Sequence, residues 1–497
     1  MSVCLSTLLD GTGIVVDSGV GAVAVSGLSY DSRRTEPGDL FFALPGVRSD
    51  GSAFVRDAVG RGAVAVVTQS GGGECTVPRL NTGDARNAMG LIGAAFYGRP
   101  SGSLKVIGIT GTNGKTTTAF LCKHILDASQ KRCGLIGTVK YVIGETEIEA
   151  PRTTPESVDL QSLLADMRDA GCKAVAMEVS SHAVSQKRTA GVAFDVAAFT
   201  NLTQDHLDYH GSMDAYFEAK AGLFDNLLQG GKKAKAVINA DDRYGHLLVE
   251  RIGKKLPVLT FGRGVRADFR ATDVNFDASG STFHLEARGR SYLVRLPLIG
   301  SFNIYNALAA LAATAAMGTE VRAAVAALAN APQVPGRLER VPAKRQFQVF
   351  VDYAHTEDAL RNVLVTLRAL RPARLIVVVG CGGDRDRSKR PLMAAAASEL
   401  ADLAIFTSDN PRSELPSAIL NDMRAGVRAG RRFEEIPERE AAIRHAVEIA
   451  AARDIIVIAG KGHENYQEAG GVRTPFDDVK IARRAIEARR VELEEED

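Results

Sequence analysis

The sequence of 497 residues lacks the features that would assign it to several special classes of protein. Its longest apolar runs, such as Ala307–Ala316, fall short of the roughly 18–20 residues that a membrane span requires. The N-terminus has no cationic segment followed by a long apolar core, so a secretory signal is not expected. Lys and Arg number 61 against 59 Asp and Glu, and this balance does not predict nucleic acid as a partner.

The six cysteines are scattered and form no Cys-x-x-Cys pair. This pattern argues against a zinc site or a disulfide framework and favours reduced thiols in the cytoplasm. Hydrophobic residues make up 45% and charged residues 24%, the usual mix of a soluble globular protein. The chain shows no heptad pattern and no long apolar edge, so we expect a monomer.

Two turn-rich stretches, Gly98–Ser103 and Ala331–Gly336, divide the chain into three expected domains, 1–101, 102–334 and 335–497. In the second and third domains, short apolar runs end in polar residues or glycine and are followed by helical patterns. This alternation is typical of the α/β class, with mostly parallel sheets covered by helices on both faces. Ligands of such sheets bind beyond the carboxyl ends of the strands.

A phosphate-binding loop is expected after the predicted strand Lys105–Thr110, where the chain reads GTNGKTTT and then continues in a helical pattern. Backbone N–H groups of such a loop converge on phosphate oxygens. Lys115 would reach the β- and γ-phosphates, and Thr116 would offer its hydroxyl to Mg²⁺. The strict G-x-x-x-x-G-K-[ST] pattern fails at Ile109, so this is a shortened variant. A glycine-rich turn without a ligand is the alternative.

Acidic and imidazole groups follow two further predicted strands. Glu178 closes the strand from Ala174 and is suited to bind a nucleotide-bound Mg²⁺, or alternatively serves as a structural cap. The segment Asn201–Gly211 contains two aspartates and two histidines. It could bind metal through a neutral imidazole, or be a solvated loop whose aspartates cap the next helix. Lys220, on the next predicted helix, would on its own be an ordinary surface lysine.

A series of motifs extends from about residue 28 to residue 464: GTNGKTT, MEVSSHA, FTNLTQDHLDYHG, EAK, NADD, GSFNIYNALAA, PGRLE, VDYAH and TSDNPR. In this order they resemble the Mur ligases, the ATP-dependent amide-forming enzymes of peptidoglycan synthesis. The resemblance implies a central P-loop-type ATPase domain with a mostly parallel sheet and a Rossmann-like C-terminal domain. It also implies that a substrate carboxylate attacks ATP to give an acyl phosphate, which the amine of an incoming amino acid then displaces.

The resemblance implies roles for the residues around the phosphate loop. Thr116 and Glu178 would bind one Mg²⁺, and His206 a second. Lys220 aligns with a lysine that is carbamylated in the family, a change that turns a cation into an anion able to face Mg²⁺. The implied ATP contacts are Gly111, Thr112, Asn113, Gly114, Lys115, Thr116, Thr117, Asn303, Asn306, Arg337 and Asp352.

The resemblance also implies the binding residues of the UDP-muramoyl-dipeptide. Ser32 belongs to the uridine end, and the rest of the substrate would contact Thr153, Thr154, Ser180, Gln186 and Arg188. A cation such as Arg188 suits an acidic dipeptide. The chain departs from some relatives at position 152, where it has Arg instead of Asn.

The added amino acid is implied by Asp409, Asn410, Pro411 and Arg412, a DNPR form that accompanies meso-diaminopimelate in the family. An arginine fork matches the second carboxylate of diaminopimelate. Lysine would instead leave Arg412 facing an ammonium, at a cost of roughly 2–5 kcal/mol. Further implied contacts are Arg385, Gly460 and Glu464.

Three alternatives stay open at this stage. Arg385 could belong to a solvated run of charges over residues 384–389. The chain could be the L-lysine-adding homologue, or a folylpolyglutamate synthetase, although the DNPR motif and the N-terminal DSR and PGDLF stretches argue against them. A P-loop nucleotide-binding switch would need neither the two further α/β parts nor the cluster in Asn201–Gly211.

Overall fold

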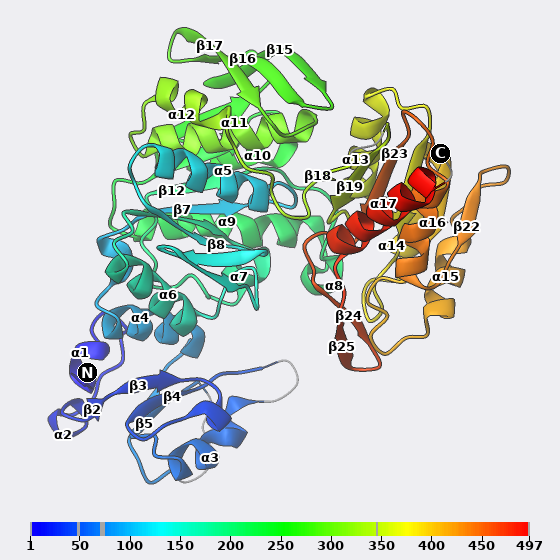
Figure 1. Cartoon of the computed structure of the whole chain (residues 1–497). Coiled ribbons are helices and arrows are strands. Elements are labelled where there is room, and N and C mark those ends of the chain that lie inside the picture. Colours follow the sequence, from blue (N-terminus) through cyan, green and yellow to red (C-terminus); the bar gives the residue numbers. More distant parts are fainter. Residues whose placement is uncertain (1, 47–49, 70–74, 344–345, 496–497) are drawn as a thin grey trace.

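The structure, a computed structural model, describes residues 2–46, 50–69, 75–343 and 346–495. Sheets of four, eleven and six strands follow one another along the chain, each within its own stretch of sequence. Figure 1 shows three corresponding bodies, the N-terminal one in blue, the central one in cyan and green, and the C-terminal one in yellow to red. This arrangement is the α/β class that the sequence predicts. The domain borders at 101/102 and 334/335 fall in connections between these sheets and stay a proposal.

The N-terminal sheet is parallel and has the order β3-β4-β5-β6. Alternate residues of β4 face opposite sides, as the pleat requires. Leu40 and Phe42 pack with α1 and α4, whereas Phe41 packs with α3. The elements are β1 (Val3–Cys4), α1 (Leu5–Leu8), α2 (Ser18–Gly21), β2 (Ala24–Val25), β3 (Gly27–Ser29), η1 (Ser32–Arg34), β4 (Asp39–Ala43), η2 (Gly51–Phe54), α3 (Val55–Gly60), β5 (Ala65–Thr68), β6 (Arg79–Asn81), α4 (Ala85–Phe96) and η3 (Pro100–Gly102).

The central sheet has the order β10-β9-β8-β11-β7-β12-β13-β14-β15-β16-β17. It is parallel from β8 to β15 and antiparallel at both edges. Its strands are β7 (Lys105–Thr110), β8 (Cys133–Ile136), β9 (Lys140–Ile143), β10 (Thr146–Glu149), β11 (Ala174–Glu178), β12 (Val196–Phe199), β13 (Lys235–Asn239), β14 (Val258–Gly262), β15 (Phe269–Asp277), β16 (Gly280–Ala287) and β17 (Arg290–Leu296).

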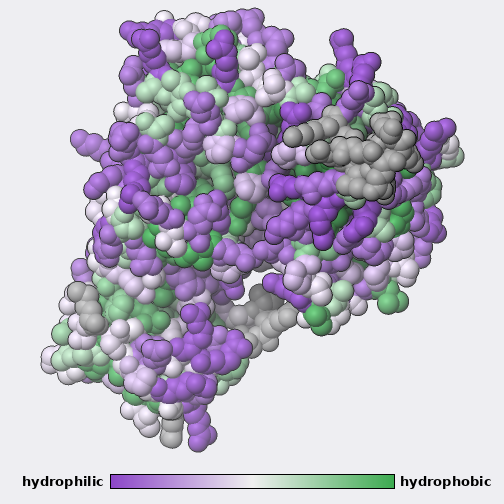
Figure 2. Space-filling view, viewed as in Figure 1, coloured by the Kyte–Doolittle hydropathy of each residue, from purple (hydrophilic) through white to green (hydrophobic). Residues whose placement is uncertain are grey.

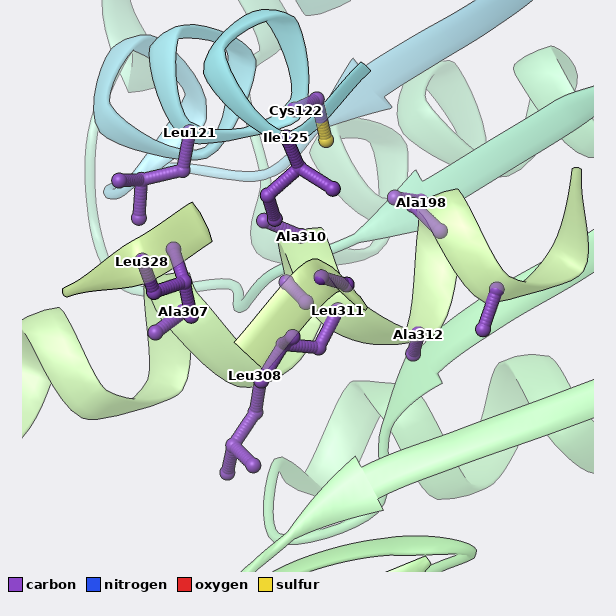
Figure 3. Packing of buried hydrophobic residues seen from close by; sticks show 14 of the residues in the cluster. Leu121, Cys122, Ile125, Ala198, Ala307, Leu308, Ala310, Leu311, Ala312 and Leu328 are labelled. Atoms are coloured by element: carbon purple, nitrogen blue, oxygen red, sulfur yellow. The ribbon is translucent and has the colours of Figure 1, made fainter. Parts of the chain in front are cut away.

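Helices cover both faces of this sheet because its strands alternate between two apolar surfaces. One cluster packs α5, α11 and α12 on one face, and another packs α6, α9 and α10 on the other. The alanine-rich α11 lies close against α5, where Leu121 and Ile125 meet Ala307 and Leu311 (Figure 3). The helices are α5 (Lys115–Ala128), α6 (Ser157–Asp169), α7 (Ser181–Ser185), α8 (Leu207–His210), α9 (Met213–Gln229), α10 (Arg243–Ile252), α11 (Ser301–Ala316) and α12 (Val321–Leu328).

The C-terminal sheet has the order β18-β19-β23-β20-β21-β22 and is parallel except for β18. Helices α13, α14 and α15 cover one face, and α16 and α17 the other. The elements are β18 (Glu339–Val341), β19 (Gln348–Asp352), α13 (Glu357–Ala369), β20 (Leu375–Val379), α14 (Lys389–Leu400), β21 (Leu403–Phe406), α15 (Pro416–Arg424), β22 (Phe433–Glu435), α16 (Arg439–Glu448), β23 (Ile455–Ala459), β24 (Tyr466–Ala469), β25 (Val472–Pro475) and α17 (Asp478–Glu495).

Specific contacts join the three bodies. Arg337, on the C-terminal side of the proposed border, donates from Nη2 to Thr116 Oγ1 at 3.0 Å. On the other side, Tyr30 of the N-terminal body donates to Asp159. Within the residues that the structure describes, no helix is both long and apolar enough to cross a membrane.

Candidate active site

Two cavities lie where the central and C-terminal bodies meet, and together they are lined by about half of the residues that the sequence predicts for the site. The larger, of about 760 Å³, is lined by Thr153, His206, Arg385, Asp409, Asn410, Arg412, Gly460 and Glu464, among others. The smaller, of about 280 Å³, is lined by Asn113, Gly114, Thr117, Asn306, Arg337 and Asp352, among others. Figure 2 shows hydrophilic side chains on both sides of the hollow between the two bodies.

The loop between β7 and α5 forms the floor of the smaller cavity. Gly111 and Gly114 have φ of +145° and +88°, which only glycine adopts readily. A Cβ atom at Gly111 would lie 1.9 Å from Thr200 Oγ1, so the close approach of the two strand ends also requires glycine. Lys115 Nζ donates to the carbonyl oxygens of Gly111 and Thr112 at 2.9 and 2.8 Å. Burial lowers the pKa of Lys115.

Thr116 and Glu178 lie side by side because β7 and β11 are neighbours in the sheet. Thr116 Oγ1 donates to Glu178 Oε2 at 3.0 Å. The same carboxylate accepts from the backbone N–H and the hydroxyl of Thr138, at 2.8 and 3.1 Å. Thr138 follows β8 in the next position of the sheet, and no sequence motif indicated it. The pair offers a hydroxyl and a carboxylate oxygen, the hard ligands that Mg²⁺ prefers.

These residues fit a magnesium ion that also takes ligands from a nucleotide. No group of three His, Cys, Asp or Glu side chains able to hold a metal occurs among the described residues. Thr116 and Glu178 therefore cannot be extended into a complete protein cage, and phosphate oxygens would have to supply further ligands. Mg²⁺ bound through one or two carboxylates plus substrate phosphates is the common case for such enzymes.

Lys220 is buried, with 1% of its surface exposed, so the reading of an ordinary surface lysine is wrong. Its Nζ donates to Gly111 O at 2.8 Å and lies 4.4 Å from the centre of the Tyr216 ring. Burial, and then the nearby Lys115 charge, lower the pKa of Lys220 well below its usual value. Lys220 lies on the buried side of α9, together with Tyr216 and Leu223, and this places its amine beneath the phosphate loop.

The histidines of the segment after β12 form a cluster of rings. His206, with φ of +53°, lies at the start of α8 with its ring centre 4.9 Å from that of His182. His210 packs on Tyr216 and shares a hydrogen bond of 2.9 Å with Ser181. Burial lowers the pKa of His182, His206 and His210 to about 4, so all three imidazoles are neutral at pH 7. Ser212, and not an aspartate, caps α9, so the expected aspartate cap is wrong, whereas Gln204, His206 and Asp208 are exposed as in a solvated loop.

Five of the predicted UDP-substrate residues lie together beyond the carboxyl end of β11. Thr154 Oγ1 donates to the Glu178 carbonyl at 2.9 Å and accepts from the N–H of Ser180 at 3.2 Å. Arg188 donates to Thr154 O at 3.1 Å and to Gln186 Oε1 at 2.6 Å. Thr153 shares a hydrogen bond with Thr138 at 3.1 Å. Ser32 is buried in η1 of the N-terminal body, apart from these five.

Glu156 is the centre of an ion-pair cluster that the sequence did not indicate. Its carboxylate lies 2.6 Å from Arg152, 3.1 Å from Arg188 and 3.5 Å from Arg86 of the N-terminal helix α4. Its side chain is only 8% exposed. The unusual Arg152 thus has a partner within the protein. Three guanidinium groups around one carboxylate leave an excess of positive charge beside the predicted substrate residues.

The C-terminal part of the larger cavity is built by the loops after β20, β21 and β23. Asn410 Nδ2 donates to Glu464 Oε2 at 2.8 Å, and Lys461 Nζ donates to both side chains at 3.0 Å. Arg412 has φ of +54° and donates from Nη1 to Gly383 O at 2.7 Å. Pro411, between them, is buried but does not line the cavity.

Arg385 and its neighbours differ in how their charges are satisfied. Arg387 pairs with Asp422, and Arg390 pairs with both Glu414 and Asp422. Arg385 lines the cavity and donates to the Asp384 carbonyl at 3.1 Å. Among the described residues, neither Arg385 nor Arg412 forms an ion pair with a carboxylate. The charge run is therefore an ordered loop from which one arginine faces the cavity.

Residues predicted to contact the nucleotide line the smaller cavity from both bodies. Asn306 Nδ2 donates to Asn303 Oδ1 at 3.0 Å; Asn306 lines the smaller cavity, whereas Asn303 is buried behind it. Asp352 accepts from the backbone N–H groups of Leu338 and Ala354, at 2.6 and 2.8 Å. Burial raises the pKa of Asp352 to about 6.

Comparison with known proteins relates this geometry to a family. Three domain descriptions match successive parts of the chain: "Mur ligase family, catalytic domain" over residues 24–97, "Mur ligase middle domain" over 109–314 and "Mur ligase, glutamate ligase domain" over 336–462. The chain is 47% identical over 471 residues to the UDP-N-acetylmuramoyl-L-alanyl-D-glutamate–2,6-diaminopimelate ligase of Geobacillus kaustophilus, covering 93% of this chain and 95% of the relative. It is 45% identical to the ligase of the same name from Syntrophomonas wolfei, with 92% and 94% covered.

Solved structures agree with this relationship. A structure of a UDP-N-acetylmuramoyl-L-alanyl-D-glutamate–2,6-diaminopimelate ligase superposes with a TM-score of 0.71 at 37% identity, covering 99% of this chain and all of that one. A MurF ligase from Thermotoga maritima, solved in complex with ADP, shares the fold at 17% identity and a TM-score of 0.64, with 94% and 99% covered. On these grounds the chain belongs to the Mur ligase family, whose members are ATP-dependent ligases.

Proposed function

We propose that this protein joins meso-diaminopimelate to UDP-N-acetylmuramoyl-L-alanyl-D-glutamate at the expense of ATP, in the cytoplasm and as a monomer. The observation that carries the proposal is the pair Arg385 and Arg412, two cations that face the larger cavity without a carboxylate partner among the described residues. Diaminopimelate differs from lysine by a second carboxylate, which such arginines would bind. The names of the relatives at 45–47% identity support the same substrate.

The reaction consists of two displacements. A carboxylate of the dipeptide attacks the γ-phosphorus of ATP, the bond to ADP breaks, and an acyl phosphate forms. The amine of diaminopimelate then attacks the acyl carbon, loses a proton, and expels phosphate to leave an amide. Both steps gather negative charge, so the role of the protein is to position the reactants and to stabilise that charge.

The cations of the central body would stabilise the phosphates. Lys115 is held against its own loop by two carbonyl oxygens and could swing its ammonium towards the β- and γ-phosphates without breaking an ion pair. The backbone of Gly111, Gly114, Thr116 and Thr117 would supply the N–H groups that face the phosphates. The backbone N–H groups of Thr112 and Asn113 already donate to Asn201, at 2.9 Å each. Arg337 and Asp352 would contact the nucleotide from the C-terminal body, and Asn303 and Asn306 would form the adenine side.

Thr116 and Glu178 would hold Mg²⁺, and neutral His206 would serve a second ion. A Mg²⁺ held by these residues would supply positive charge that neutralises the phosphates. Lys220 would act as a carbamate. Its lowered pKa leaves the amine uncharged more often, and an uncharged amine is the form that reacts with CO₂. The anion so formed could face a metal, which an ammonium could not.

The two other substrates would bind on either side of this centre. The UDP-muramoyl-dipeptide would contact Ser32, Thr153, Thr154, Ser180, Gln186 and Arg188. The amino acid would contact Arg385, Asp409, Asn410, Pro411, Arg412, Gly460 and Glu464. Closure of the C-terminal body over the phosphate loop would exclude water and protect the acyl phosphate from hydrolysis.

Phosphate release tests this proposal. The purified protein is incubated with ATP, Mg²⁺ and UDP-N-acetylmuramoyl-L-alanyl-D-glutamate, with either meso-diaminopimelate or L-lysine added. We expect release that depends on all substrates and is strong only with diaminopimelate. Equal release with lysine would keep the ligase activity but contradict the role of Arg412. Release from ATP alone would instead indicate a nucleotide switch.

A further inference from the structure

Arg439 is a fully buried arginine that lies behind the amino-acid side of the larger cavity. It begins α16, and its side chain has no exposed surface. Nε and Nη2 donate to the two carboxylate oxygens of Asp478 at 2.9 and 2.7 Å. Asp478 begins α17 and is equally buried. The two helices are thereby joined at their first residues.

The remaining donors of the same guanidinium reach two strand ends. Nη2 donates to Ala459 O at 3.0 Å, and Nη1 donates to Ser408 O at 3.3 Å. Ala459 ends β23 and directly precedes Gly460, while Ser408 directly precedes Asp409. Strands β23 and β21 are not neighbours, because β20 lies between them. One rigid fork therefore bridges the two loops that carry most of the proposed amino-acid contacts.

The loops around this bridge leave no room for side chains at two glycines. A Cβ atom at Gly460 would lie 2.6 Å from Asp409 Oδ2, and one at Gly380, after β20, would lie 2.4 Å from Thr407 O. Small changes in the spacing of the strand ends would thus move the site directly. The contacts between Asn410, Glu464 and Lys461 depend on the same spacing, because they connect the same two loops.

Stability alone does not explain an arginine at this position. A buried ion pair is often no more stabilising than well-packed apolar side chains of similar size. A lysine could pair with Asp478 but could not hold a planar fork on a carboxylate and two carbonyl oxygens at once. Burial by itself lowers the pKa of Arg439, but the carboxylates of Asp478, Asp409 and Glu464 outweigh it and raise that pKa.

We propose that Arg439 is a positioning residue for the added amino acid. It touches no substrate, but it sets the distance between the loop that begins at Asp409 and the loop that begins at Gly460. The inference rests on the proposed function, since it concerns the binding of the amino acid in that reaction. Its loss would weaken the binding of diaminopimelate while leaving the ATP site, in the other cavity, as it is.

The test is Arg439→Lys. This variant keeps the positive charge beside Asp478 but loses the planar guanidinium that donates to Asp478 and to both loops at once. We expect the KM for meso-diaminopimelate to rise at least about tenfold and the KM for ATP to stay within about twofold, since a misplacement of 1 Å can cost about 100-fold. A purely structural role would lower the melting temperature and the active fraction without changing this ratio of KM values. That outcome would overturn the proposal.

The chain offers a control at the opposite ends of the strands of the same sheet. Arg374 donates twice to Asp454, at 3.0 and 2.6 Å, where the strands begin and not where they end. The Asp454 side chain has no exposed surface, like that of Asp478, whereas the Arg374 side chain is 43% exposed. Arg374→Lys should lower the melting temperature but leave both KM values unchanged. An equal rise in the KM for diaminopimelate in both variants would mean that general destabilisation is the cause.

A second variant keeps the proposal testable if Arg439→Lys does not fold. Asp478→Asn retains the size of the side chain but removes one of the two oxygens that accept from Arg439. We expect a smaller rise in the KM for diaminopimelate, with the KM for ATP again unchanged. An unchanged KM for diaminopimelate in this variant would overturn the proposal. The wild-type protein, assayed in parallel, separates the two questions, because failure of the proposed function would appear as no release with diaminopimelate at all.

Discussion

The two bodies that form the candidate site satisfy their buried cations in opposite ways. In the central body, Lys115 and Lys220 are held only by backbone carbonyl oxygens, and burial lowers the pKa of each. In the C-terminal body, Arg390 and Arg439 have side chains without exposed surface, but carboxylates neutralise both. Lys115 is therefore ready to meet the negative charge of a ligand, and Lys220 to react as an uncharged amine, whereas Arg390 and Arg439 are already neutralised within the protein.

This difference separates cations that are free to bind a ligand from cations that carboxylates of the protein already neutralise. Arg412 and Arg385 lie in the C-terminal body, but, like the central lysines, they contact carbonyl oxygens and lack a carboxylate partner among the described residues. An unneutralised cation beside a cavity gains most when an anion binds, because desolvation strengthens the interaction. By this criterion Arg412 and Arg385 belong with Lys115 as cations that can bind an anionic ligand.

The strongest test of the comparison is the removal of the buried Lys220 of the central body. Lys220→Ala should lower turnover by about 100-fold or more, since it removes a charged group from the reacting centre. Added acetate or formate should partly restore activity by supplying the missing carboxylate of the carbamate. Turnover is measured by phosphate release, with the exposed Lys233→Ala as the control. Full activity of Lys220→Ala would contradict the proposed role.

Removal of an unpaired arginine should affect one substrate only. Arg412→Ala should raise the KM for meso-diaminopimelate about 30-fold or more, because loss of an arginine–carboxylate pair costs at least about 2 kcal/mol. The KM for ATP should not change. Arg424→Ala, which breaks a surface pair with Glu435 in the same body, serves as the control. Equal effects on both substrates would remove the selectivity role of Arg412.

The cluster around Glu156 is a mixed case, since three arginines share one carboxylate. Glu156→Gln should raise the KM for the UDP-linked substrate about fivefold to tenfold, because Arg188 loses the charged acceptor that orients it. The KM for diaminopimelate should stay constant. A tighter binding of the UDP-linked substrate would show instead that Glu156 competes with the substrate for these arginines.

The smallest effect is expected from Glu414, a carboxylate that neutralises the buried Arg390. The Arg390 guanidinium holds the pKa of Glu414 at about 2, below its usual 4.5. A lowered carboxyl pKa stabilises the folded state above pH 4.5, and this contribution is lost as the pH falls towards 2. Glu414→Gln should therefore melt a few degrees below wild type at pH 7. Melting curves recorded from pH 7 to pH 3 should show this difference shrinking below pH 4.5, and a constant difference would contradict the argument.

The sequence predicted the strands that carry the site with good accuracy because their apolar runs end abruptly. The strand expected over Lys105–Thr110 is β7, and the one expected over Ala174–Glu178 is β11. Parallel strands bring their carboxyl ends together, so Thr116 and Glu178 could be expected to meet. The role of Thr138 could not be foreseen, since a single threonine after a short strand has no distinctive pattern.

Burial and charge pairing were decided only by the tertiary structure. On the residues alone Lys220 would be an ordinary surface lysine, yet it lies beneath the phosphate loop, whose Gly111 is 109 residues away in sequence. The family resemblance implied Arg188, but it did not indicate the partner Glu156.

What the sequence by itself determined is therefore the order of the motifs, the α/β alternation and the phosphate loop, because these depend on residues that are close along the chain. What the tertiary structure decided is which cations are neutralised and which are not. Arg439 finds Asp478 39 residues away, whereas Arg412 finds only a carbonyl oxygen. The physical reason is that desolvation and Coulomb interactions depend on distance in space, which the sequence pattern does not contain.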